Sequence, residues 1–305
     1  MQRVLLTGAT GFIGRHCVPR LASRGLEVHA VSSRPPAEAA EGIVWHRADL
    51  LDETQVGDLA AAARATHLLH LAWHTRPGDL YGSPANQRWA DAGLALLRAA
   101  GEHGLERAAV AGSCAEYDWR DVAGDLAEEG SPLAPQSEYG RAKLRLSGLA
   151  REWAGSAGVS LVWPRIFFLY GPGEDRRRLV PAVITALLAG EEAQLTHGRQ
   201  VRDYLYVEDA AQLLVDLLAA AVEGPVNVGS GRPVTVAEIA AEAARQLDGQ
   251  GLVRLGARPA PAGEPPRLVA DVGRLTRALG WRPATSLTEG LARTIRWWRG
   301  VGATA

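Results

Sequence analysis

Several classes of protein need residues that this sequence has little of. Only two of the 305 residues are cysteines, Cys17 and Cys114, and neither belongs to a Cys-x-x-Cys pair. We therefore expect no disulfide framework, no metal site and a reducing compartment, the cytoplasm. No run approaches the about 18 uncharged apolar residues of a membrane span, so we expect no membrane partner.

Charge of one sign is also scarce. The formal net charge is -1, which gives no basic field that would attract nucleic acid. The first residues lack a basic stretch followed by a long apolar one, so we expect no secretory signal. With 47% hydrophobic and 22% charged residues, the chain has the composition of a globular protein, long enough for one large α/β domain or two lobes.

In the first half of the chain, short apolar runs alternate with stretches of helical periodicity. We expect strands at residues 4–6, 27–31, 43–46, 67–71, 108–111 and 159–166, with helices that include residues 12–23, 85–102 and 137–154. Such alternation predicts an α/β fold with a Rossmann-type, doubly wound parallel sheet.

The pattern changes after residue 170. Helices are expected at residues 179–188, 209–221, 272–279 and 287–298, strands near 203–206 and 226–228, and a proline-rich loop at 258–266. We therefore expect a main domain over residues 1–170 and about 203–230. A smaller, interleaved C-terminal lobe would cover residues 171–202 and 231–305.

A glycine-rich turn connects the expected first strand to the first helix. A glycine lacks Cβ, so the chain can turn tightly and a pyrophosphate can approach the backbone amides at the helix N-terminus. A plain strand–helix turn is the alternative, but this position favours a dinucleotide site. Its expected contacts are Gly8, Thr10, Gly11, Phe12, Ile13 and Gly14.

The end of the expected second strand decides between NAD and NADP. An acidic residue there would bind the adenosine ribose hydroxyls, whereas this strand ends in Ser32, Ser33 and Arg34. Two hydroxyls and a guanidinium suit a 2′-phosphate, which favours NADP(H). If Arg34 is simply solvated, NAD(H) is the alternative. Further cofactor contacts are expected after the third and fourth strands, at Asp49, Leu50, Leu71, Ala72 and Trp73.

Three residues form a candidate catalytic set. Tyr139 and Lys143 are four residues apart, so they share one face of a helix, where the ammonium would lower the pKa of the phenol. Ser113 ends the fifth strand, at the sheet edge where open α/β sheets bind ligands. A tyrosine and a lysine at this spacing are common on helices, and a serine often ends a strand because it favours turns. The catalytic assignment therefore depends on where the three residues lie in the expected fold.

Five motifs together resemble the NAD-dependent epimerase/dehydratase family of extended short-chain dehydrogenases. They are TGATGFIG at residues 7–14, GSCAEY at 112–117, YGRAK at 139–143, RIFFLYGPG at 165–173 and RDYLYVEDAA at 202–211. The resemblance implies that the main domain binds the dinucleotide and the smaller lobe a nucleoside diphosphate-sugar. It also implies a homodimer through the helices at residues 85–102 and 137–154, although their alanine-rich faces could equally pack inside one subunit.

The resemblance also implies site residues. Ser113, Tyr139 and Lys143 would be catalytic, and Arg165 would follow the nicotinamide. Arg202 would pair with the diphosphate of the substrate; the alternative is a structural pair with Asp203 or Glu208. Further substrate contacts are implied at Asn86, Leu179, Val180 and Cys114, although Cys114 could instead only pack.

Departures from the family pattern narrow the chemistry. Dehydratases of this family carry an Asp-Glu pair directly after the catalytic hydroxyl residue, where this chain has Cys114 and Ala115. Water elimination is therefore not expected. A family arginine before Gly263 is also missing, and either Arg258 or Arg267 could replace it.

Two reactions remain that need only a hydride and one proton. The serine–serine–arginine sequence favours NADPH-dependent reduction of the C4 ketone of a nucleoside diphosphate-4-keto-6-deoxyhexose, and residues 70–74 (HLAWH) resemble such reductases. The alternative is an NAD-dependent 4-epimerase. A reductase of flavonoid-like or steroid ketones is disfavoured by Arg202, and a non-catalytic NADP-sensing regulator by the retained Tyr139 and Lys143.

Overall fold

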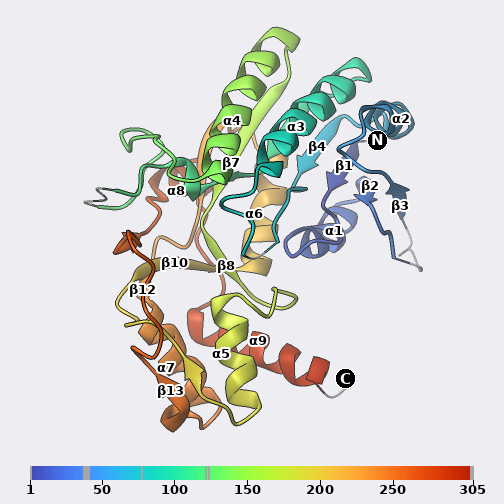
Figure 1. The fold of residues 1–305 in the computed structure, drawn as a ribbon. Coiled ribbons are helices and arrows are strands. Elements are labelled where there is room, and N and C mark those ends of the chain that lie inside the picture. The colour runs from blue at the N-terminus through green and yellow to red at the C-terminus, as the bar shows by residue number, and fades with distance from the viewer. Residues whose placement is uncertain (1, 37–41, 77, 121, 123, 303–305) are drawn as a thin grey trace.

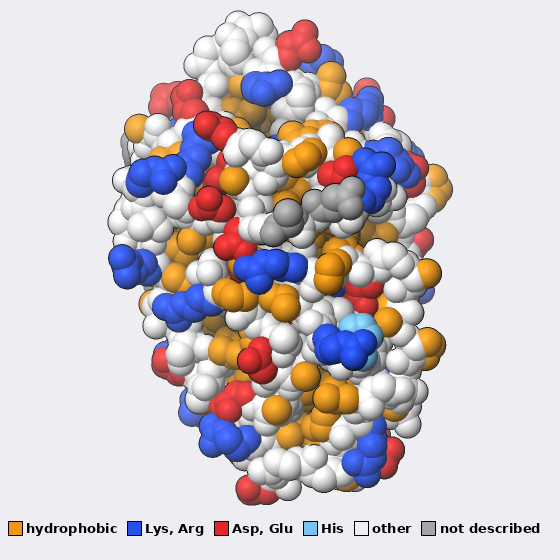
Figure 2. Space-filling view, turned by 90° about the vertical axis from the view of Figure 1, so that its left-hand side faces the viewer, with side chains coloured by type: hydrophobic (Ala, Val, Ile, Leu, Met, Phe, Trp, Pro, Cys, Tyr) orange, Lys and Arg blue, Asp and Glu red, His pale blue; other side chains and the backbone are white. Residues whose placement is uncertain are grey.

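The structure is a computed structural model that describes residues 2–36, 42–76, 78–120, 122 and 124–302. Its two lobes lie one above the other in Figure 1. Basic and acidic side chains are interspersed over the face drawn in Figure 2, in keeping with the net charge of -1. Among the described residues, no helix has both the length and the apolar character that a membrane span requires.

A parallel sheet forms the centre of the upper lobe. Its strands follow the order β11-β7-β5-β4-β1-β2-β3, and the short β6 (Gly112–Ser113) pairs with β7. This confirms the Rossmann-type fold that the alternating pattern predicts. The strands are β1 (Arg3–Thr7), β2 (Glu27–Ser32), β3 (Ile43–Arg47), β4 (His67–His70), β5 (Arg107–Val110), β7 (Ser160–Ile166) and β11 (Gly224–Val228).

Helices cover both faces of this sheet. The apolar sides of α2 (Glu53–Ala63), α3 (Ala85–Glu102) and α4 (Glu138–Ala157) share one core with the sheet. On the other face, α1 (Gly14–Ala22) and α6 (Val207–Ala219) pack on each other and on the sheet. Small residues such as Ala90, Gly93 and Ala142 line the buried sides of α3 and α4, so these helices pack closely within one chain.

The lower lobe is built around a second, smaller sheet. Strand β10 (Val201–Tyr206) pairs with β8 (Phe168–Tyr170), β12 (Pro233–Thr235) and β14 (Arg267–Leu268). The helices α5 (Leu179–Leu188), α7 (Val236–Gln246) and α9 (Leu287–Gly302) form the core of this lobe. The remaining elements are β9 (Ala193–Gln194), β13 (Val253–Arg254), α8 (Gly273–Leu279) and the 3-10 helices η1 (Cys114–Glu116) and η2 (Gln250–Leu252).

The chain passes repeatedly between the two lobes. Strand β7 of the main sheet leads within two residues into β8 of the second sheet, while α6 and β11 return to the main sheet after β10. Buried Asp203 on β10 holds this junction, because its carboxylate accepts hydrogen bonds from Ser230 N, Gly231 N and Ala270 N. The carboxyl end of the main sheet therefore adjoins the second lobe.

Candidate active site

The glycine turn between β1 and α1 forms a cradle that only glycine can build. Gly8 has a φ of +68°, and a Cβ there would lie 2.9 Å from Ala72 N. A Cβ on Gly14 would lie 2.1 Å from Gly8 O, so a side chain would push the helix away from the turn. Open backbone beside a helix N-terminus fits the pyrophosphate of a dinucleotide.

The end of β2 lies beside this cradle. The Ser32 hydroxyl is hydrogen-bonded to the Thr10 hydroxyl (2.9 Å) and accepts the Arg34 N–H (3.1 Å). Ser32 is also paired in register with Arg47 of β3, and the side chains of Arg34 and Arg47 are both exposed. No local pattern in the sequence marks Arg47, because its position beside Ser32 depends on strand pairing.

Two further residues expected at the adenine end lie after β3. Asp49 is exposed, and its carboxylate accepts the Leu51 N–H, whereas Leu50 is buried in the core under α2. Phe12 and Ile13 of the glycine turn are half-buried against the opposite core. Phe12, Ile13 and Leu50 therefore belong to the core around the cradle, whereas Asp49 lies at the surface.

Ser113 and Tyr139 are brought together by a close approach of α4 to η1. Gly140 makes this approach possible, since a Cβ there would lie 2.1 Å from Ala115 O. The side chains of Ser113 and Tyr139 are hydrogen-bonded to each other, and the Ser113 hydroxyl also accepts the Ala115 N–H (3.1 Å). The structure thus brings together the serine and tyrosine that the sequence separates by 25 residues.

Lys143, the only lysine in the sequence, lies one turn further along α4. Its Nζ donates a hydrogen bond to Ala111 O (2.7 Å) and lies 3.5 Å from the centre of the Trp73 ring. Only 3% of the residue is exposed, and burial lowers the pKa of the Lys143 ammonium to about 7, while the charge of Glu116 acts in the opposite direction.

The pKa of Tyr139 differs from the sequence-based expectation. Burial raises it above the usual value for a phenol, and the hydrogen bond from Ser113 only partly offsets this effect. The lysine does not lower it here, because Nζ is 5.9 Å from the centre of the Tyr139 ring and is held by Ala111 and Trp73 instead. The expected lowering is therefore corrected: desolvation dominates.

Aromatic rings enclose Tyr139. Trp73 and Tyr81 contact it edge-on, with ring centres 6.1 and 5.9 Å away, and Trp119 packs on the outer side of Tyr81. Tyr81 O also accepts the Tyr139 N–H, and the Tyr81 side chain is hydrogen-bonded to Arg178 at the start of α5. No motif in the sequence marks Tyr81, which links the catalytic set to the second lobe.

The structure revises the roles of two expected contact residues. Asn86 is fully buried, and its amide is used inside the chain: Oδ1 accepts from Trp73 Nε1 (2.8 Å) and Nδ2 donates to Leu80 O and Ser83 O. It therefore positions Trp73 and has no free group for a substrate. Arg165 is 3% exposed and pairs with Glu116 (2.9 Å) beneath Ser113, so it does not line an open wall.

A cavity of about 400 Å³ lies in the second lobe. Arg202 on its wall pairs with Glu264 (3.0 Å) and donates to Pro265 O, so its partner is neither Asp203 nor Glu208. Its charge also acts on Cys114, beside the catalytic serine. The residues that line this cavity include Phe168, Leu179, Gln194, Thr196, Arg258 and Glu264.

The structure distinguishes Arg258 from Arg267, the two candidates to replace the arginine that the family carries before Gly263. Arg258 lines the cavity, whereas Arg267 pairs with Asp125 outside the set of lining residues. Of the other expected contacts, Leu179 faces the cavity, while Val180 is buried in the core of the lobe. Cys114 is buried among apolar residues, and burial raises the pKa of its thiol to about 12. Cys114 is therefore not a thiolate nucleophile.

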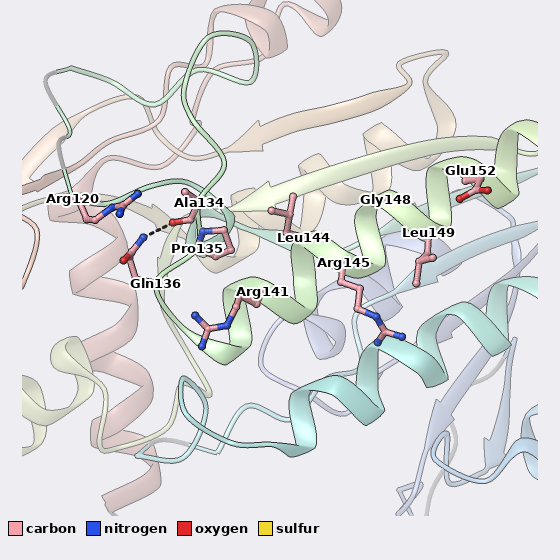
Figure 3. Close-up of a pocket in the computed structure, with 10 residues that line it drawn as sticks. All are labelled: Arg120, Ala134, Pro135, Gln136, Arg141, Leu144, Arg145, Gly148, Leu149 and Glu152. Atoms are coloured by element: carbon pink, nitrogen blue, oxygen red, sulfur yellow. Dashed lines mark hydrogen bonds between the residues drawn. The ribbon is translucent and has the colours of Figure 1, made fainter.

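A second hollow runs along the outer side of α4 (Figure 3). It shares no lining residue with the catalytic set or with the second-lobe cavity. Arg141, Leu144, Arg145, Gly148 and Leu149 of α4 line it, together with Pro135 from the preceding loop.

Comparison with known proteins identifies the family. A model described as the NAD dependent epimerase/dehydratase family matches residues 4–229. The chain belongs to this family. This confirms the resemblance of the five motifs and the extended short-chain dehydrogenase fold.

Individual family members are similar over nearly the whole chain. A dTDP-glucose 4,6-dehydratase from Actinoplanes sp. is 29% identical, over 98% of both proteins. The structure of a Thermus thermophilus UDP-glucose 4-epimerase in complex with NAD superposes with a TM-score of 0.86, at 30% identity over 98% of this chain and 99% of that one. The Thermotoga maritima UDP-glucose 4-epimerase, 24% identical with a TM-score of 0.91 over 98% and 99%, shares the fold.

The glycine cradle generates a prediction. Replacing Gly14 with alanine should lower the free energy of unfolding by roughly 2 kcal/mol or more and abolish dinucleotide binding, because the new Cβ meets Gly8 O. Urea unfolding and NADPH titration would measure both effects. Gly57 in α2 is the matched control: apart from the local helix backbone, no atom of the part of the chain that the structure describes lies within 4 Å of its Cβ position, so Gly57→Ala should stabilise by about 0.5–1 kcal/mol. Unchanged dinucleotide binding in Gly14→Ala would contradict the assignment of the cradle.

Proposed function

We propose that this enzyme uses NADPH to reduce the C4 ketone of a nucleoside diphosphate-4-keto-6-deoxyhexose. The observation that carries the proposal is the phosphate-binding chemistry at the end of β2. There the hydroxyls of Ser32 and Ser33 and the guanidinium of Arg34 are joined by Arg47 from β3. Two arginines and two hydroxyls bind a 2′-phosphate far better than the diol of NAD.

The substrate class is supported by the second lobe. Relatives are named for dTDP-glucose and UDP-glucose, and their similarity covers nearly the whole chain. Arg202 and Arg258 line the same cavity in this chain, which suits the two charges of a diphosphate. In this proposal the main sheet with its helices holds the dinucleotide and the second lobe holds the sugar nucleotide.

The catalytic set supports a single reduction step. Bound NADPH would supply a hydride to C4. Tyr139 would give its proton to the oxygen that develops negative charge, and its raised pKa keeps that proton on the phenol until it is needed. Ser113, hydrogen-bonded to Tyr139, would bind the same oxygen. Lys143 would orient the nicotinamide ribose, and the rings of Trp73 and Tyr81 would exclude water.

Dehydration is not supported, although dehydratases are among the relatives. The two positions after Ser113 carry Cys114 and Ala115, which are 5% and 3% exposed and hold no carboxylate. The next residue, Glu116, is fully buried and bonded to Trp163 and Arg165. The elimination of water needs an acid and a base beside the sugar, and these residues supply neither.

NAD-dependent 4-epimerisation is the second candidate. It is favoured by the similarity to the Thermus enzyme, which is a UDP-glucose 4-epimerase with NAD bound. An epimerase would use the same Ser113, Tyr139 and Lys143 but would keep its cofactor bound through each turnover.

Cofactor titration separates the two candidates. For protein stripped of dinucleotide, we expect tighter binding of NADPH than of NADH, measured by nicotinamide fluorescence. Arg34→Ala should weaken NADPH binding about tenfold or more and leave NADH unchanged, because one charge-assisted contact is lost. Tighter NADH binding, or a dinucleotide that cannot be removed, would favour the epimerase.

Removal of the phenol tests the proton donor. Tyr139→Phe should lower kcat for a 4-keto-6-deoxy sugar nucleotide by at least about 100-fold, because the proposed general acid is removed. Its dissociation constant for NADPH should stay close to that of the unmodified enzyme. A variant that keeps full activity would refute the role of Tyr139.

We also propose a homodimer. Since the alanine-rich sides of α3 and α4 are used within one chain, contact between subunits would fall on their outer sides, where Leu144, Gly148 and Leu149 line the hollow of Figure 3.

Light scattering would test the dimer. Among the described residues, no atom outside the surrounding helix backbone lies within 4 Å of the Cβ position of Gly148, so Gly148→Arg should preserve the fold and yet shift the mass from dimer to monomer. Gly57→Arg, equally unobstructed on α2, is the control and should remain dimeric. A monomeric parent protein would reject the proposal.

A further inference from the structure

A fully buried carboxylate lies beneath the catalytic serine. Glu116 has no exposed surface, and its Oε2 pairs with Arg165 Nε (2.9 Å). Its Oε1 accepts hydrogen bonds from Trp163 Nε1 (3.0 Å) and Ser113 N (2.8 Å). The described contacts of the carboxylate thus come from inside the chain, and none of them requires a substrate.

The surrounding backbone is shaped to admit this group. A Cβ on Gly112 would lie 2.7 Å from Glu116 Oε1 and 2.3 Å from Trp163 Nε1, so the residue before the catalytic serine has no side chain. Placing a paired charge in the interior is expensive, and an apolar replacement of similar volume is often neutral or stabilising. A buried glutamate and arginine at this position therefore point to a role other than stability.

Glu116 acts on two members of the catalytic set by different routes. Its bond to Ser113 N and the bond from Ala115 N to the Ser113 hydroxyl close the turn of η1 from both sides. This fixes the direction of the hydroxyl toward Tyr139. Lys143 Nζ is held by Ala111 O and the Glu116 carboxylate by Ser113 N, two residues further along the same backbone, so the two charged groups lie close together. The negative charge of Glu116 therefore favours the protonated form of Lys143, which burial disfavours.

We propose that Glu116 is a positioning residue, which sets the orientation of Ser113 through its backbone and keeps the buried Lys143 charged. The effect on Lys143 is a property of the free protein, and only its consequence for turnover rests on the proposed function.

The groups around Lys143 make Glu116 the main source of negative charge. His70 on β4 faces the same space, but burial lowers its pKa to about 3, so it is neutral at pH 7. Tyr139 on α4 carries a proton at pH 7, as any phenol of ordinary pKa does, and burial raises its pKa further. Ala111 O and the ring of Trp73 contribute dipoles and no net charge. As pH rises through about 7, Lys143 loses its proton, and loss of the Glu116 charge would move this change to lower pH.

The single lysine allows a direct measurement. In protein labelled with carbon-13 at the lysine Cε, one side-chain signal reports on Lys143 alone, and its shift against pH gives the titration midpoint. We expect Glu116→Gln to lower the midpoint by about one pH unit, because a nearby negative charge is removed and the shape is kept. Asp203→Asn is the matched control: it also converts a buried carboxylate to an amide, but at the lobe junction, and should leave the midpoint unchanged.

Two further variants keep the test decisive. If Glu116→Gln alone does not fold, Glu116→Gln combined with Arg165→Gln removes both buried charges. The midpoint should again fall, because Glu116 is the charge that acts on Lys143 and Arg165 is not among the groups that shift its pKa. Glu116→Asp keeps the charge but shortens the reach to Ser113 N, so the midpoint should stay near that of the parent protein while kcat drops. A midpoint that does not move in either glutamine variant, or moves equally in Asp203→Asn, would overturn the proposal.

Turnover distinguishes this inference from the proposed function. With an active substrate, Glu116→Gln should shift the alkaline limb of the kcat profile to lower pH, in step with the Lys143 midpoint. If the midpoint falls but no 4-keto sugar nucleotide is reduced by the parent enzyme, the role of Glu116 stands and the proposed function fails.

Discussion

The catalytic arrangement depends on the close contact between the first turn of α4 and the backbone of η1. Gly140 allows it, because any side chain there would collide with Ala115 O. From this contact follow the hydrogen bond between Ser113 and Tyr139 and the placement of Lys143 beside Ala111 O. The position that holds the proposed catalytic set together is therefore a glycine, which lies between the tyrosine and the lysine of the Tyr-x-x-x-Lys motif and has no reactive side chain.

Burial at this contact has opposite consequences for the two titratable groups. It raises the pKa of Tyr139 and lowers that of Lys143, so desolvation pushes both toward their neutral forms. A phenol that retains its proton can act as a general acid, which is the role that the proposed reduction assigns to Tyr139. The charge on the lysine must be supported from elsewhere, and Glu116 lies in the interior where solvent does not screen it.

Much of the fold follows from local patterns in the sequence. The apolar runs and the intervening helical periodicity predict the parallel sheet, and the limits expected for the helices at residues 85–102 and 179–188 match α3 and α5. The helix α7 was missed, although Thr235 and Glu238 form a capping box at its start. The pairing of β10 in the second sheet was also not predicted, because the local sequence of a strand between two helices does not indicate which sheet the strand joins.

Local sequence patterns predict the positions of candidate site residues that are close in sequence, as in the glycine turn and the pair of Tyr139 and Lys143 on one helix. The roles of residues that depend on contacts between distant parts of the sequence could not be predicted. Asn86 accepts a hydrogen bond from Trp73, and Arg47 lies beside Ser32 only because their strands pair. In the sequence Glu116 looks like an ordinary polar residue of a turn, and its role depends on Trp163 and Arg165 of β7, which contact it in the fold. The side chains that support the catalytic set thus lie outside its motifs.

The presence of one lysine, buried under Trp73, has a practical consequence. All other basic side chains that are permanently charged are arginines, which do not react with the activated esters used to label or cross-link proteins. The exposed surface therefore offers such reagents no lysine amine. Acylation of Lys143 would require α4 to separate from the Trp73 loop. The rate of inactivation by an amine reagent would therefore measure how often this region opens.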